Sequence, residues 1–361
     1  MTANLILEDG TIFEGLSFGA QQSIAGEVVF STGMVGYPEG ITDPSYKGHI
    51  LILTYPLIGN YGVPDPMFWE SDRIHISGLI VSNYIDTPSH FQSKRTLASW
   101  LRDENVPALE IKDTRLLTEK IKGKGSTLGK IIIKKQIPFY DPNKDNLVAK
   151  VSTKKIAYHT EASHNGKKRI LLYIDCGGKR NIIRCLLKRG ADVITVPWDF
   201  DPFEGVKLRH LEGESDLHRL NGIVISNGPG DPKMAGKTIE VIKKAIAEKI
   251  PLLGICLGHQ LLTLAAGGDT KKLKFGHRSQ NQPCLLAGSK RCYITTQNHG
   301  FAVNEIPKGF KPWFTNANDN SNEGIIHTKH PFMSVQFHPE ANPGPQDTEW
   351  IFDYFLNRIR K

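Results

Sequence analysis

The sequence contains few cysteines and lacks several motifs that would assign a function class. Its five cysteines are Cys176, Cys185, Cys256, Cys284 and Cys292, and no two form a C-x-x-C pair. This spacing argues against a structural zinc site or a disulfide framework, so we expect a cytoplasmic protein. No G-x-x-x-x-G-K-[ST] loop is present, and a P-loop nucleotide site is therefore not expected.

Long apolar runs are also missing. The most apolar window, residues 250–268, is about as long as a membrane span, but it contains His259, Gln260 and four glycines. A buried strand followed by a buried helix fits this window better, and no membrane contact is expected. The chain starts MTANLILEDG, which has no Lys or Arg and soon reaches Glu8 and Asp9. No targeting segment is therefore predicted there.

The charge is unevenly distributed along the chain. The formal net charge is +8, yet residues 1–150 carry 15 Lys and Arg against 17 Asp and Glu, while residues 151–361 carry 30 against 20. A basic half is compatible with nucleic-acid, membrane or acidic-protein binding, and equally with a solubility surface. The basic residues lack interleaved aromatic side chains, so we expect no nucleic-acid partner. We interpret the excess of positive charge as a property of the exposed surface and of interfaces with partner proteins.

Residues 1–150 are predicted to form a β-rich α/β domain. Short apolar runs between Gly, Pro, Asn and Asp turn signals predict strands at Leu5–Leu7, Thr11–Phe13, Glu27–Phe30, Ile50–Thr54 and Lys130–Ile133. Apolar residues at helical spacing predict helices at Phe91–Asp103 and Thr114–Ile121. The polar, weakly periodic residues 151–167 are predicted to be a linker.

Residues 168–361 show a different sequence pattern, in which predicted apolar strands alternate with predicted helices. Strands are predicted at Arg169–Ile174, Val193–Val196, Gly222–Ser226 and Pro251–Ile255, and helices at Lys179–Arg189, Thr238–Glu248 and Leu257–Ala266. This alternation is typical of an α/β domain with a mostly parallel sheet flanked by helices. In such sheets functional sites lie at the carboxyl ends of the strands.

The sharpest local feature is Gly254-Ile-Cys256-Leu-Gly258-His-Gln260, between a predicted strand and a predicted helix. Glycines two residues to either side permit a strained turn that lifts the cysteine side chain clear of the sheet, as in a nucleophile elbow. A helix that begins at Leu257 also directs its positive dipole end toward the sulfur, which favours a thiolate. A buried core cysteine is the alternative interpretation.

A cysteine nucleophile needs a base, and His338 is the candidate. It follows a strand-like run and is followed by Pro339 and Glu340. On an extended chain the side chains of residues 338 and 340 project to the same face, so Glu340 is predicted to hold the imidazole. A cysteine, a histidine and an acid far apart in sequence are the expected arrangement for a triad assembled by the fold.

Two further polar segments accompany these residues. The turn Ser226-Asn-Gly228-Pro-Gly230-Asp-Pro follows a predicted strand, and its backbone N–H groups suit an oxyanion hole or a carboxylate-binding site. Taken by itself, the segment is better interpreted as a plain turn. The segment Gln297-Asn-His-Gly-Phe301 is polar, and physical reasoning alone gives it no role.

Together these motifs resemble a known family. Asn227-Gly-Pro-Gly-Asp-Pro, the elbow at Cys256 and His338-Pro-Glu occur in the order found in the class I glutamine amidotransferase domain, and the resemblance covers about residues 168–361. It implies a Cys-His-Glu triad that releases ammonia from glutamine through a γ-glutamyl thioester.

The N-terminal part narrows the family. Its segments closely resemble the carbamoyl-phosphate synthase small chain at residues 26–37, 42–46, 54–62 and 113–115, and so does the segment 297–301. The resemblance implies Cys256 as nucleophile, His338 as general base and acid, and Glu340 as its orienting acid. It implies a glutamine pocket formed by Ser45, Gly228, Gly230, Leu257, Gln260, Asn298, Gly300 and Phe301.

The resemblance also implies a partner. A carbamoyl-phosphate synthase large chain would use the ammonia, with bicarbonate and ATP, to make carbamoyl phosphate for pyrimidine or arginine synthesis. ATP and Mg²⁺ would bind only that chain, no cofactor or metal is expected on this one, and the two would form at least a heterodimer. The alternative is a catalytically silent scaffold or binding protein on the same fold. The presence of all three triad residues argues against it.

Overall fold

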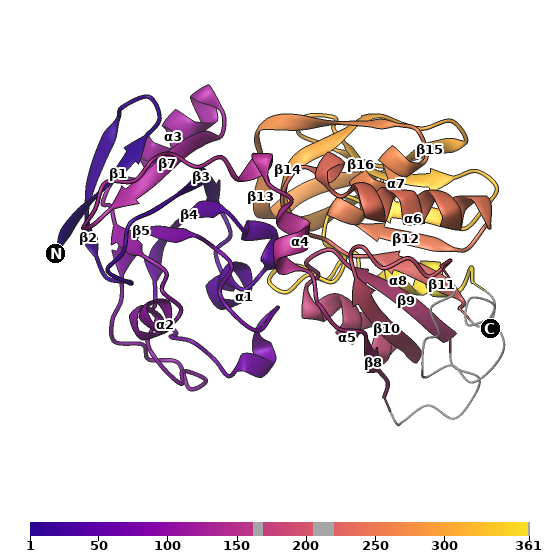
Figure 1. The fold of residues 1–361 in the computed structure, drawn as a ribbon, viewed down its shortest axis with the longest axis horizontal. Coiled ribbons are helices and arrows are strands. Elements are labelled where there is room, and N and C mark those ends of the chain that lie inside the picture. Colours follow the sequence, from indigo (N-terminus) through magenta and orange to yellow (C-terminus); the bar gives the residue numbers. More distant parts are fainter. Residues whose placement is uncertain (162–168, 205–219, 360–361) are drawn as a thin grey trace. The chain divides into compact units, whose positions relative to one another are not determined.

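The computed structural model describes residues 1–161, 169–204 and 220–359. The chain divides into two compact units, coloured by sequence in Figure 1. Unit 1 comprises Met1–Leu147 together with Lys274–Gln280 and Asn342–Gly344, and unit 2 comprises the rest. The predicted domain limits of 1–150, 151–167 and 168–361 remain predictions. Part of the predicted linker is regular, because helix α4 (Leu147–Val151) and strand β8 (Ala157–His159) lie at its start.

Unit 1 is built on a closed seven-stranded barrel in the order β1-β2-β6-β5-β4-β3-β7. The strands are β1 Thr2–Leu7, β2 Ile12–Ser17, β3 Ile24–Ser31, β4 His49–Ile58, β5 Gly78–Tyr84, β6 Ala108–Glu110 and β7 Thr127–Ile132. The helices are α1 Tyr37–Ile41, α2 Leu97–Asp103 and α3 Thr114–Lys124, with short 3-10 turns η1 Pro44–Tyr46, η2 Pro66–Phe68 and η3 Pro142–Lys144.

Alternation along the strands explains the core of unit 1. In β4, Ile50 and Ile52 join the apolar cluster that includes α3, whereas Leu51 and Leu53 join the cluster that includes α1 and α2. Because successive side chains of a strand point to opposite faces, a continuous apolar run is what a strand covered on both faces requires. The predicted β-rich α/β character of this part is confirmed.

One helix predicted in unit 1 starts later than predicted. The helix predicted at Phe91–Asp103 begins at Leu97, because the Thr96 hydroxyl caps it by accepting a hydrogen bond from the Ser99 N–H at 3.2 Å. Phe91 lies outside the helix and is 86% exposed, so its aromatic ring is not part of the helical apolar stripe.

Unit 2 contains a ten-stranded sheet in the order β14-β13-β15-β16-β17-β12-β11-β9-β10-β8. The remaining strands are β9 Arg169–Asp175, β10 Ala191–Pro197, β11 Gly222–Ile225, β12 Leu252–Ile255, β13 Asp269–Leu286, β14 Cys292–Glu305, β15 Phe310–Asn316, β16 Asn322–His327 and β17 Phe332–Val335. The helices are α5 Arg180–Lys188, α6 Gly236–Ala247, α7 Leu257–Ala265 and α8 Trp350–Leu356, with the 3-10 turn η5 Pro232–Met234.

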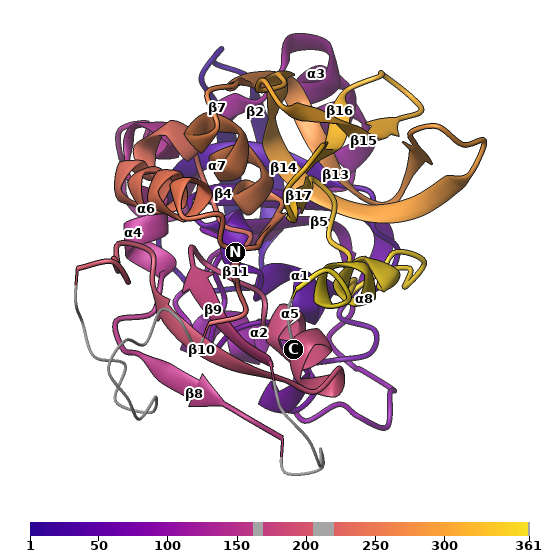
Figure 2. The ribbon, with the colours of Figure 1, turned by 90° about the vertical axis from the view of Figure 1, so that its right-hand side faces the viewer.

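Helices cover both faces of the central strands of this sheet. Leu171 and Tyr173 of β9 pack in the cluster that contains α5 and α8, while Leu172 and Ile174 pack in the cluster that contains α6 and α7. Figure 2 shows these helix pairs on opposite sides of the strands. Each fully buried aliphatic side chain contributes about 1.5–3 kcal/mol by leaving water, so this double cover is the main source of stability.

The predicted parallel core is confirmed, since β10, β9, β11, β12 and β17 pair in parallel. The antiparallel extension through β16, β15, β13 and β14 was not predicted. The charged stretch 204–219 lies almost wholly outside the described residues.

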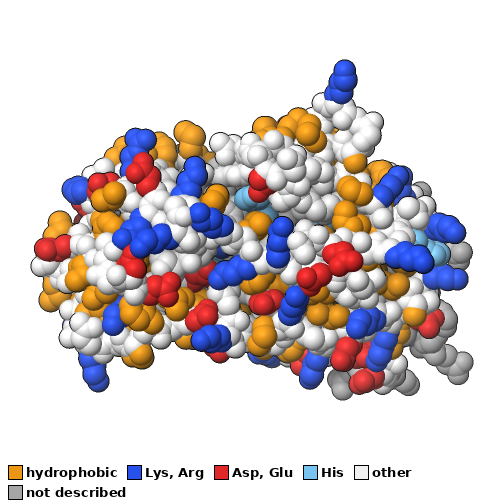
Figure 3. Space-filling model, turned by 90° about the horizontal axis from the view of Figure 1, so that it is seen from above, with side chains coloured by type: hydrophobic (Ala, Val, Ile, Leu, Met, Phe, Trp, Pro, Cys, Tyr) orange, Lys and Arg blue, Asp and Glu red, His pale blue; other side chains and the backbone are white. Residues whose placement is uncertain are grey.

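Two surface observations bear on the remaining predictions. No helix in the described ranges combines the length and the apolar character needed to cross a membrane. On the face drawn in Figure 3, Lys and Arg side chains are interspersed with Asp and Glu, and one basic group at the right lies beside histidines. The excess of positive charge is therefore spread over this face rather than gathered into one track.

Candidate active site

The candidate site forms where four neighbouring parallel strands end. Strands β17, β12, β11 and β9 are adjacent in the sheet, and each runs directly into one of the polar segments singled out by sequence or into the turn before α5. Parallel strands bring their carboxyl ends to one edge of a sheet. The sequence prediction that the functional residues gather at this edge holds for the turns after β17, β12 and β11, and the turn after β9 adds a residue that was not predicted.

Cys256 sits in a strained elbow between β12 and α7. Its φ of 53° is a conformation that non-glycine residues rarely adopt. A Cβ on Gly254 would lie 2.4 Å from the Gly258 carbonyl oxygen, and one on Gly258 would lie 2.3 Å from the Ile225 carbonyl oxygen. The flanking glycines are therefore needed for close backbone approach, as predicted. Cys256 is 2% exposed and serves as the N-cap of α7.

His338 and Glu340 form a buried pair on the segment after β17. Nδ1 of His338 lies 2.7 Å from Oε1 of Glu340, and both side chains are at most 1% exposed. The predicted extended conformation is wrong: the Ala341 N–H donates to the His338 carbonyl oxygen at 3.1 Å, which closes a turn. The turn, rather than strand alternation, brings the acid back to the imidazole.

The charges at the site support one another. Burial alone would lower the pKa of His338, but the charge of Glu340 and the neighbouring Cys256 raise it to about 10. Burial alone would raise the pKa of Glu340, but Lys179 and His338 lower it to about 2. The imidazole therefore keeps a proton beside an anionic carboxylate and can donate that proton to a neighbouring group.

Three predicted glutamine-pocket residues are connected to the sulfur of Cys256 by a series of contacts. Sγ of Cys256 is 3.7 Å from the Asn298 carbonyl oxygen. Nε2 of Gln260 donates to the Phe301 carbonyl oxygen at 2.8 Å and to Oε1 of Gln336 at 3.0 Å. Nε2 of Gln336 in turn donates to Sγ of Cys256 at 3.7 Å. The structure thus joins the elbow, the 297–301 segment and the residue after β17 in one network.

The two turns predicted to form an oxyanion hole are neighbours. A Cβ on Gly228 would meet the Leu257 side chain at 2.8 Å, so the turn after β11 lies against the start of α7. Leu257 is the first residue of that helix, where backbone N–H groups have no intrahelical acceptor. Gly230 adopts φ of 84° in the same turn, and Gly300 lies within β14.

Ser45, the remaining predicted pocket residue, belongs to unit 1. It is buried in η1, and its N–H donates to Oδ1 of Asp43 at 2.9 Å. This hydrogen bond fixes the backbone of the 3-10 turn. Its assignment to the glutamine pocket stays a prediction.

His259, the histidine of the elbow motif, is a core residue. Its ring is fully buried and Nδ1 lies 2.9 Å from the Ser334 hydroxyl. Burial lowers the pKa of His259 to about 3, so the ring stays neutral in the folded protein. The elbow motif therefore contains the candidate nucleophile and a buried core histidine, and the candidate base lies elsewhere in the sequence.

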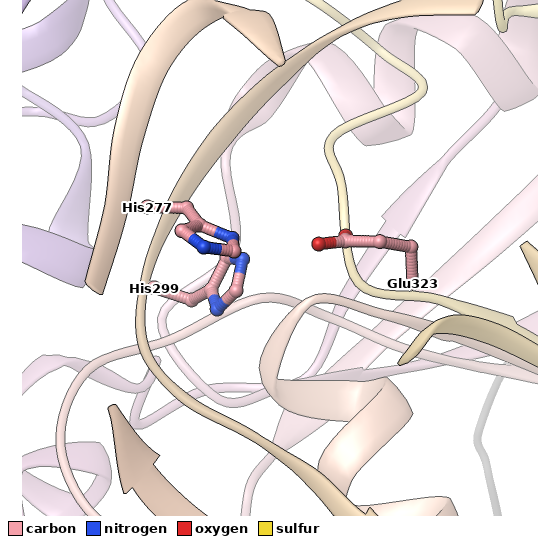
Figure 4. A group of neighbouring side chains, drawn as sticks. All are labelled: His277, His299 and Glu323. Atoms are coloured by element: carbon pink, nitrogen blue, oxygen red, sulfur yellow. The ribbon is translucent and has the colours of Figure 1, made fainter. Parts of the chain in front are cut away.

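His299 and Glu323 are drawn with His277 in Figure 4 as side chains of the kind that bind metals. Both ring nitrogens of His299 already have partners within unit 2: Nδ1 lies 2.8 Å from the Phe301 carbonyl oxygen and Nε2 lies 3.1 Å from Oε1 of Gln297. His277 belongs to the 274–280 segment of unit 1. His299 therefore acts as a structural support of the 297–301 segment.

Sequence reasoning missed two residues of the site. Lys179 is only 2% exposed, and its Nζ lies 3.0 Å from Oε1 of Glu340. Gln336 is fully buried and contacts the sulfur of Cys256. Both follow the carboxyl end of a parallel strand, so the rule that located the other residues points to their turns, although it does not predict that Lys179 is buried.

Comparison with known proteins gives two family matches. Residues 172–358 match the model of "Glutamine amidotransferase class-I", and residues 5–131 match "Carbamoyl-phosphate synthase small chain, CPSase domain". The first match contains Cys256, His338 and Glu340, and the second covers most of the barrel of unit 1.

Individual relatives agree with these matches. The carbamoyl phosphate synthase arginine-specific small chain of Saccharomyces cerevisiae is 45% identical, over 99% of this chain and 89% of that protein. The multifunctional protein CAD of Squalus acanthias is 48% identical over 99% of this chain, and the mitochondrial carbamoyl-phosphate synthase [ammonia] of Mus musculus is 45% identical over 100% of it.

The lengths of the relatives differ widely. The chain spans 16–21% of the multifunctional proteins that it matches, but nearly all of the arginine-specific small chain. Together with the two domain matches, these relatives confirm the resemblance drawn from the motifs. The chain belongs to the carbamoyl-phosphate synthase small-chain family and carries its class-I glutamine amidotransferase domain.

Proposed function

We propose that this chain hydrolyses glutamine with Cys256 as nucleophile and hands the ammonia to a carbamoyl-phosphate synthase large chain. The observation that carries the proposal is the strained elbow at Cys256 next to a fully buried His338–Glu340 pair with an Nδ1–Oε1 distance of 2.7 Å. A cysteine beside a histidine that is oriented by an acid is the arrangement that acyl transfer requires.

The reaction follows from the charges. The Cys256 thiolate attacks the side-chain amide carbon of glutamine, and the carbonyl oxygen becomes an oxyanion. Protonated His338 then gives its proton to the leaving nitrogen, so the C–N bond breaks, ammonia leaves and a γ-glutamyl thioester remains. Neutral His338 next takes a proton from water, whose oxygen attacks the thioester carbon. Breaking the C–S bond releases glutamate and restores the thiolate.

The proposed oxyanion hole consists of the backbone N–H groups of Gly228 and Leu257. Donors aimed at the developing charge stabilise the tetrahedral intermediate, and each contributes about 10²–10³ in rate. The proximity of the two turns, shown by the contact between Gly228 and Leu257, supports this assignment. The glutamine itself would be held by Ser45, Gly230, Gln260, Asn298, Gly300 and Phe301.

We further propose a division of labour between two chains. The large chain would bind ATP and Mg²⁺ and convert bicarbonate and the ammonia into carbamoyl phosphate for pyrimidine or arginine synthesis. Free ammonia would be protonated in water, so the complex is expected to pass it through a closed route. The domain match over residues 5–131 supports a role of unit 1 in docking that chain.

A silent scaffold is the second candidate, and one observation favours it. A relative named carbamoyl-phosphate synthase [ammonia] is 45% identical to this chain, the same value as for the arginine-specific small chain. Overall identity therefore does not separate a chain that uses glutamine from one that supports an ammonia-dependent enzyme. The triad does, because a scaffold has no need for a strained cysteine beside a charged imidazole.

Glutamate release decides between the two. The wild-type chain with its large chain is expected to release glutamate from glutamine, and Cys256→Ser is expected to abolish this. His338→Asn is expected to block hydrolysis as well, while synthesis from added ammonia in the complex is retained. A wild-type complex that releases no glutamate refutes the proposal. Loss of the ammonia-dependent synthesis in His338→Asn would mean that His338 holds the assembly together.

A further inference from the structure

Lys179 is an unusual residue for the interior of a protein. It is 2% exposed and belongs to the largest fully buried side chains of the described chain. A buried ammonium group loses its hydration, so it persists only where a specific partner compensates it. The partner is Glu340, whose carboxylate is 0% exposed and lies 3.0 Å from Nζ.

The turn between β9 and α5 places this lysine with little freedom. Oδ1 of Asp175 accepts hydrogen bonds from the N–H groups of Gly177 at 3.0 Å and Gly178 at 2.7 Å. The N–H of Lys179 donates to Oδ1 of Asn227 at 2.9 Å, which pins the turn to the polar segment after β11. The position of Lys179 is therefore set by the same backbone that forms the proposed oxyanion turn.

Glycine is required at this turn. A Cβ on Gly178 would lie 1.8 Å from the Tyr173 hydroxyl oxygen, and Gly177 has φ of 108°. Such a turn brings the backbone of residue 179 close to the strand ends, so the side chain enters the site rather than solvent.

The lysine contacts both the side chain and the backbone of the acid's turn. Nζ donates to the Ala341 carbonyl oxygen as well as to Oε1 of Glu340. Nδ2 of Asn181 donates to the Glu340 carbonyl oxygen at 2.5 Å, from the first turn of α5. The start of α5 thus holds the turn that carries the orienting carboxylate.

Other titratable groups also face Glu340. His338 shares its Oε1, Tyr173 and Cys185 interact with its charge, and Cys256 lies beyond His338. Of the two cations, His338 loses its proton each time ammonia leaves in the proposed reaction. Lys179 keeps its charge throughout, so it compensates the carboxylate at the stage when the imidazole is neutral.

We propose that Lys179 is a positioning residue that acts through Glu340, keeping the carboxylate ionised and aimed at Nδ1 of His338 through every stage of turnover. The inference rests on the proposed glutaminase function. It predicts that Lys179 affects the chemical step and not the binding of glutamine. The reason is that Lys179 contacts Glu340, Glu340 contacts His338, and His338 in turn interacts with Cys256, so the lysine is the residue of this series farthest from the sulfur.

The test uses the full chain in complex with its large chain. Lys179→Met is expected to lower kcat for glutamate release about 10- to 100-fold, by analogy with the loss seen when the hydrogen-bond partner of a metal-binding histidine is removed. KM for glutamine is expected to change less than about threefold, since the substitution removes no contact that binds the substrate equally in the ground state and the transition state. Lys179→Arg keeps the charge and is expected to recover part of kcat.

The pH profile separates positioning from a general structural role. Lys179 lowers the pKa of Glu340, so its removal raises that pKa and the carboxylate becomes protonated at a higher pH. The acid limb of kcat/KM is therefore expected to move to higher pH in Lys179→Met. An unmoved acid limb together with an unchanged kcat overturns the inference.

A double-mutant cycle tests the route through Glu340. In the Glu340→Gln background, Lys179→Met removes a lysine that no longer has a carboxylate to hold, and no further loss of kcat is expected. A further tenfold loss there would show that Lys179 acts elsewhere and would overturn the inference. Because Met and Gln form a neutral buried pair, this comparison remains available if the single Lys179→Met chain does not fold.

Wild type and Cys256→Ser serve as references. If wild type releases no glutamate, the proposed function fails. If wild type is active, Cys256→Ser is inactive and Lys179→Met behaves as wild type, this inference alone fails. Synthesis from added ammonia, expected to be unchanged in every variant, reports that the complex is intact.

Discussion

Nδ1 of His338 lies 2.7 Å from Oε1 of Glu340, and both side chains are closed off from solvent. The pair fixes Nδ1 as the imidazole nitrogen that faces the acid and leaves Nε2 as the nitrogen proposed to serve the sulfur of Cys256. It also raises the pKa of His338 to about 10, although burial alone would lower it. The geometry therefore predicts that the negative charge of Glu340, and not only its volume, is needed.

Glu340→Gln keeps the volume and removes the charge. We expect kcat for glutamate release to fall by about 10²–10⁴-fold, because an amide neither fixes the tautomer nor stabilises the imidazolium. The pKa of His338 falls when its anion is lost, so the alkaline limb of the pH profile is expected to move to lower pH. Steady-state assays of the complex across pH measure both effects.

Glu349→Gln is the matched control. Glu349 also belongs to unit 2 and pairs with Arg189 at 3.3 Å, away from the triad. Its activity is expected to stay within about twofold of wild type, since its ion-pair partners are Arg189 and Lys188 rather than His338. If both Gln variants retain full activity, the role assigned to Glu340 is refuted.

The elbow predicts an asymmetry between two glycines. In Gly258→Ala the new Cβ would lie 2.3 Å from the Ile225 carbonyl oxygen, which is backbone and cannot move aside. We expect this variant to lose about 1–3 kcal/mol of unfolding free energy and most of its glutaminase activity. Chemical denaturation and glutamate release check the two effects.

Gly236→Ala, at the start of α6, is the comparison. A Cβ there meets nothing within 4 Å, so the substitution is expected to be neutral or to stabilise by about 0.4–1 kcal/mol. Equal destabilisation by the two substitutions would contradict the close-approach argument for Gly258.

The parallel core and the elbow could be predicted because their signals are local. β9, β11 and β12 are continuous apolar runs. The glycines two residues before and after Cys256 indicate a tight turn with close backbone approach. The turn after β17 was placed correctly, but its conformation was not. Whether Glu340 reaches His338 by strand alternation or by a turn depends on the hydrogen bond from Ala341, which no side-chain pattern encodes.

The burial of Lys179 could not be read from local sequence. A lysine at the predicted start of an amphipathic helix is ordinarily a solvated residue, and its burial depends on Glu340, far along the chain.

The antiparallel strands β13 to β16 were not predicted for a related reason. β13 is rich in polar residues such as Lys271 and Gln282, and it is a strand because of its long-range pairing.

Reactivity of the cysteines gives a third prediction. A thiol-directed glutamine analogue is expected to label Cys256 first among the five. Cys176, Cys185 and Cys284 are buried, and burial raises the pKa of each thiol, so they remain protonated. Cys292 is exposed but lies outside the site. Mass spectrometry of peptides after brief exposure measures the order of labelling.

Two variants serve as controls for the labelling. Cys256→Ser is expected to abolish the rapid phase, and Cys292→Ser is expected to leave it unchanged. Labelling of Cys176 as fast as Cys256 would contradict the activated elbow, since Cys176 packs in the apolar cluster between the sheet and α6 and α7.

His259 predicts how stability depends on pH. Burial lowers the pKa of His259 in the folded protein to about 3, from an ordinary value of 6.5. Below the ordinary value, the unfolded chain binds a proton that the folded chain does not. Stability is therefore fully present above about pH 6.5 and is lost as the pH falls toward 3, at about 1.4 kcal/mol per pH unit.

Substitution of this histidine should remove that slope. Between pH 6 and pH 4, the unfolding free energy of His259→Gln is expected to fall less steeply than that of wild type. The difference between the two slopes is expected to be about 1.4 kcal/mol per pH unit. A residual slope is expected, because burial also lowers the pKa of His75, to about 4. His90→Gln, at an exposed position, is expected to parallel wild type. Urea unfolding at three pH values distinguishes the curves, and parallel lines for His259→Gln and wild type would show that His259 is protonated inside the fold.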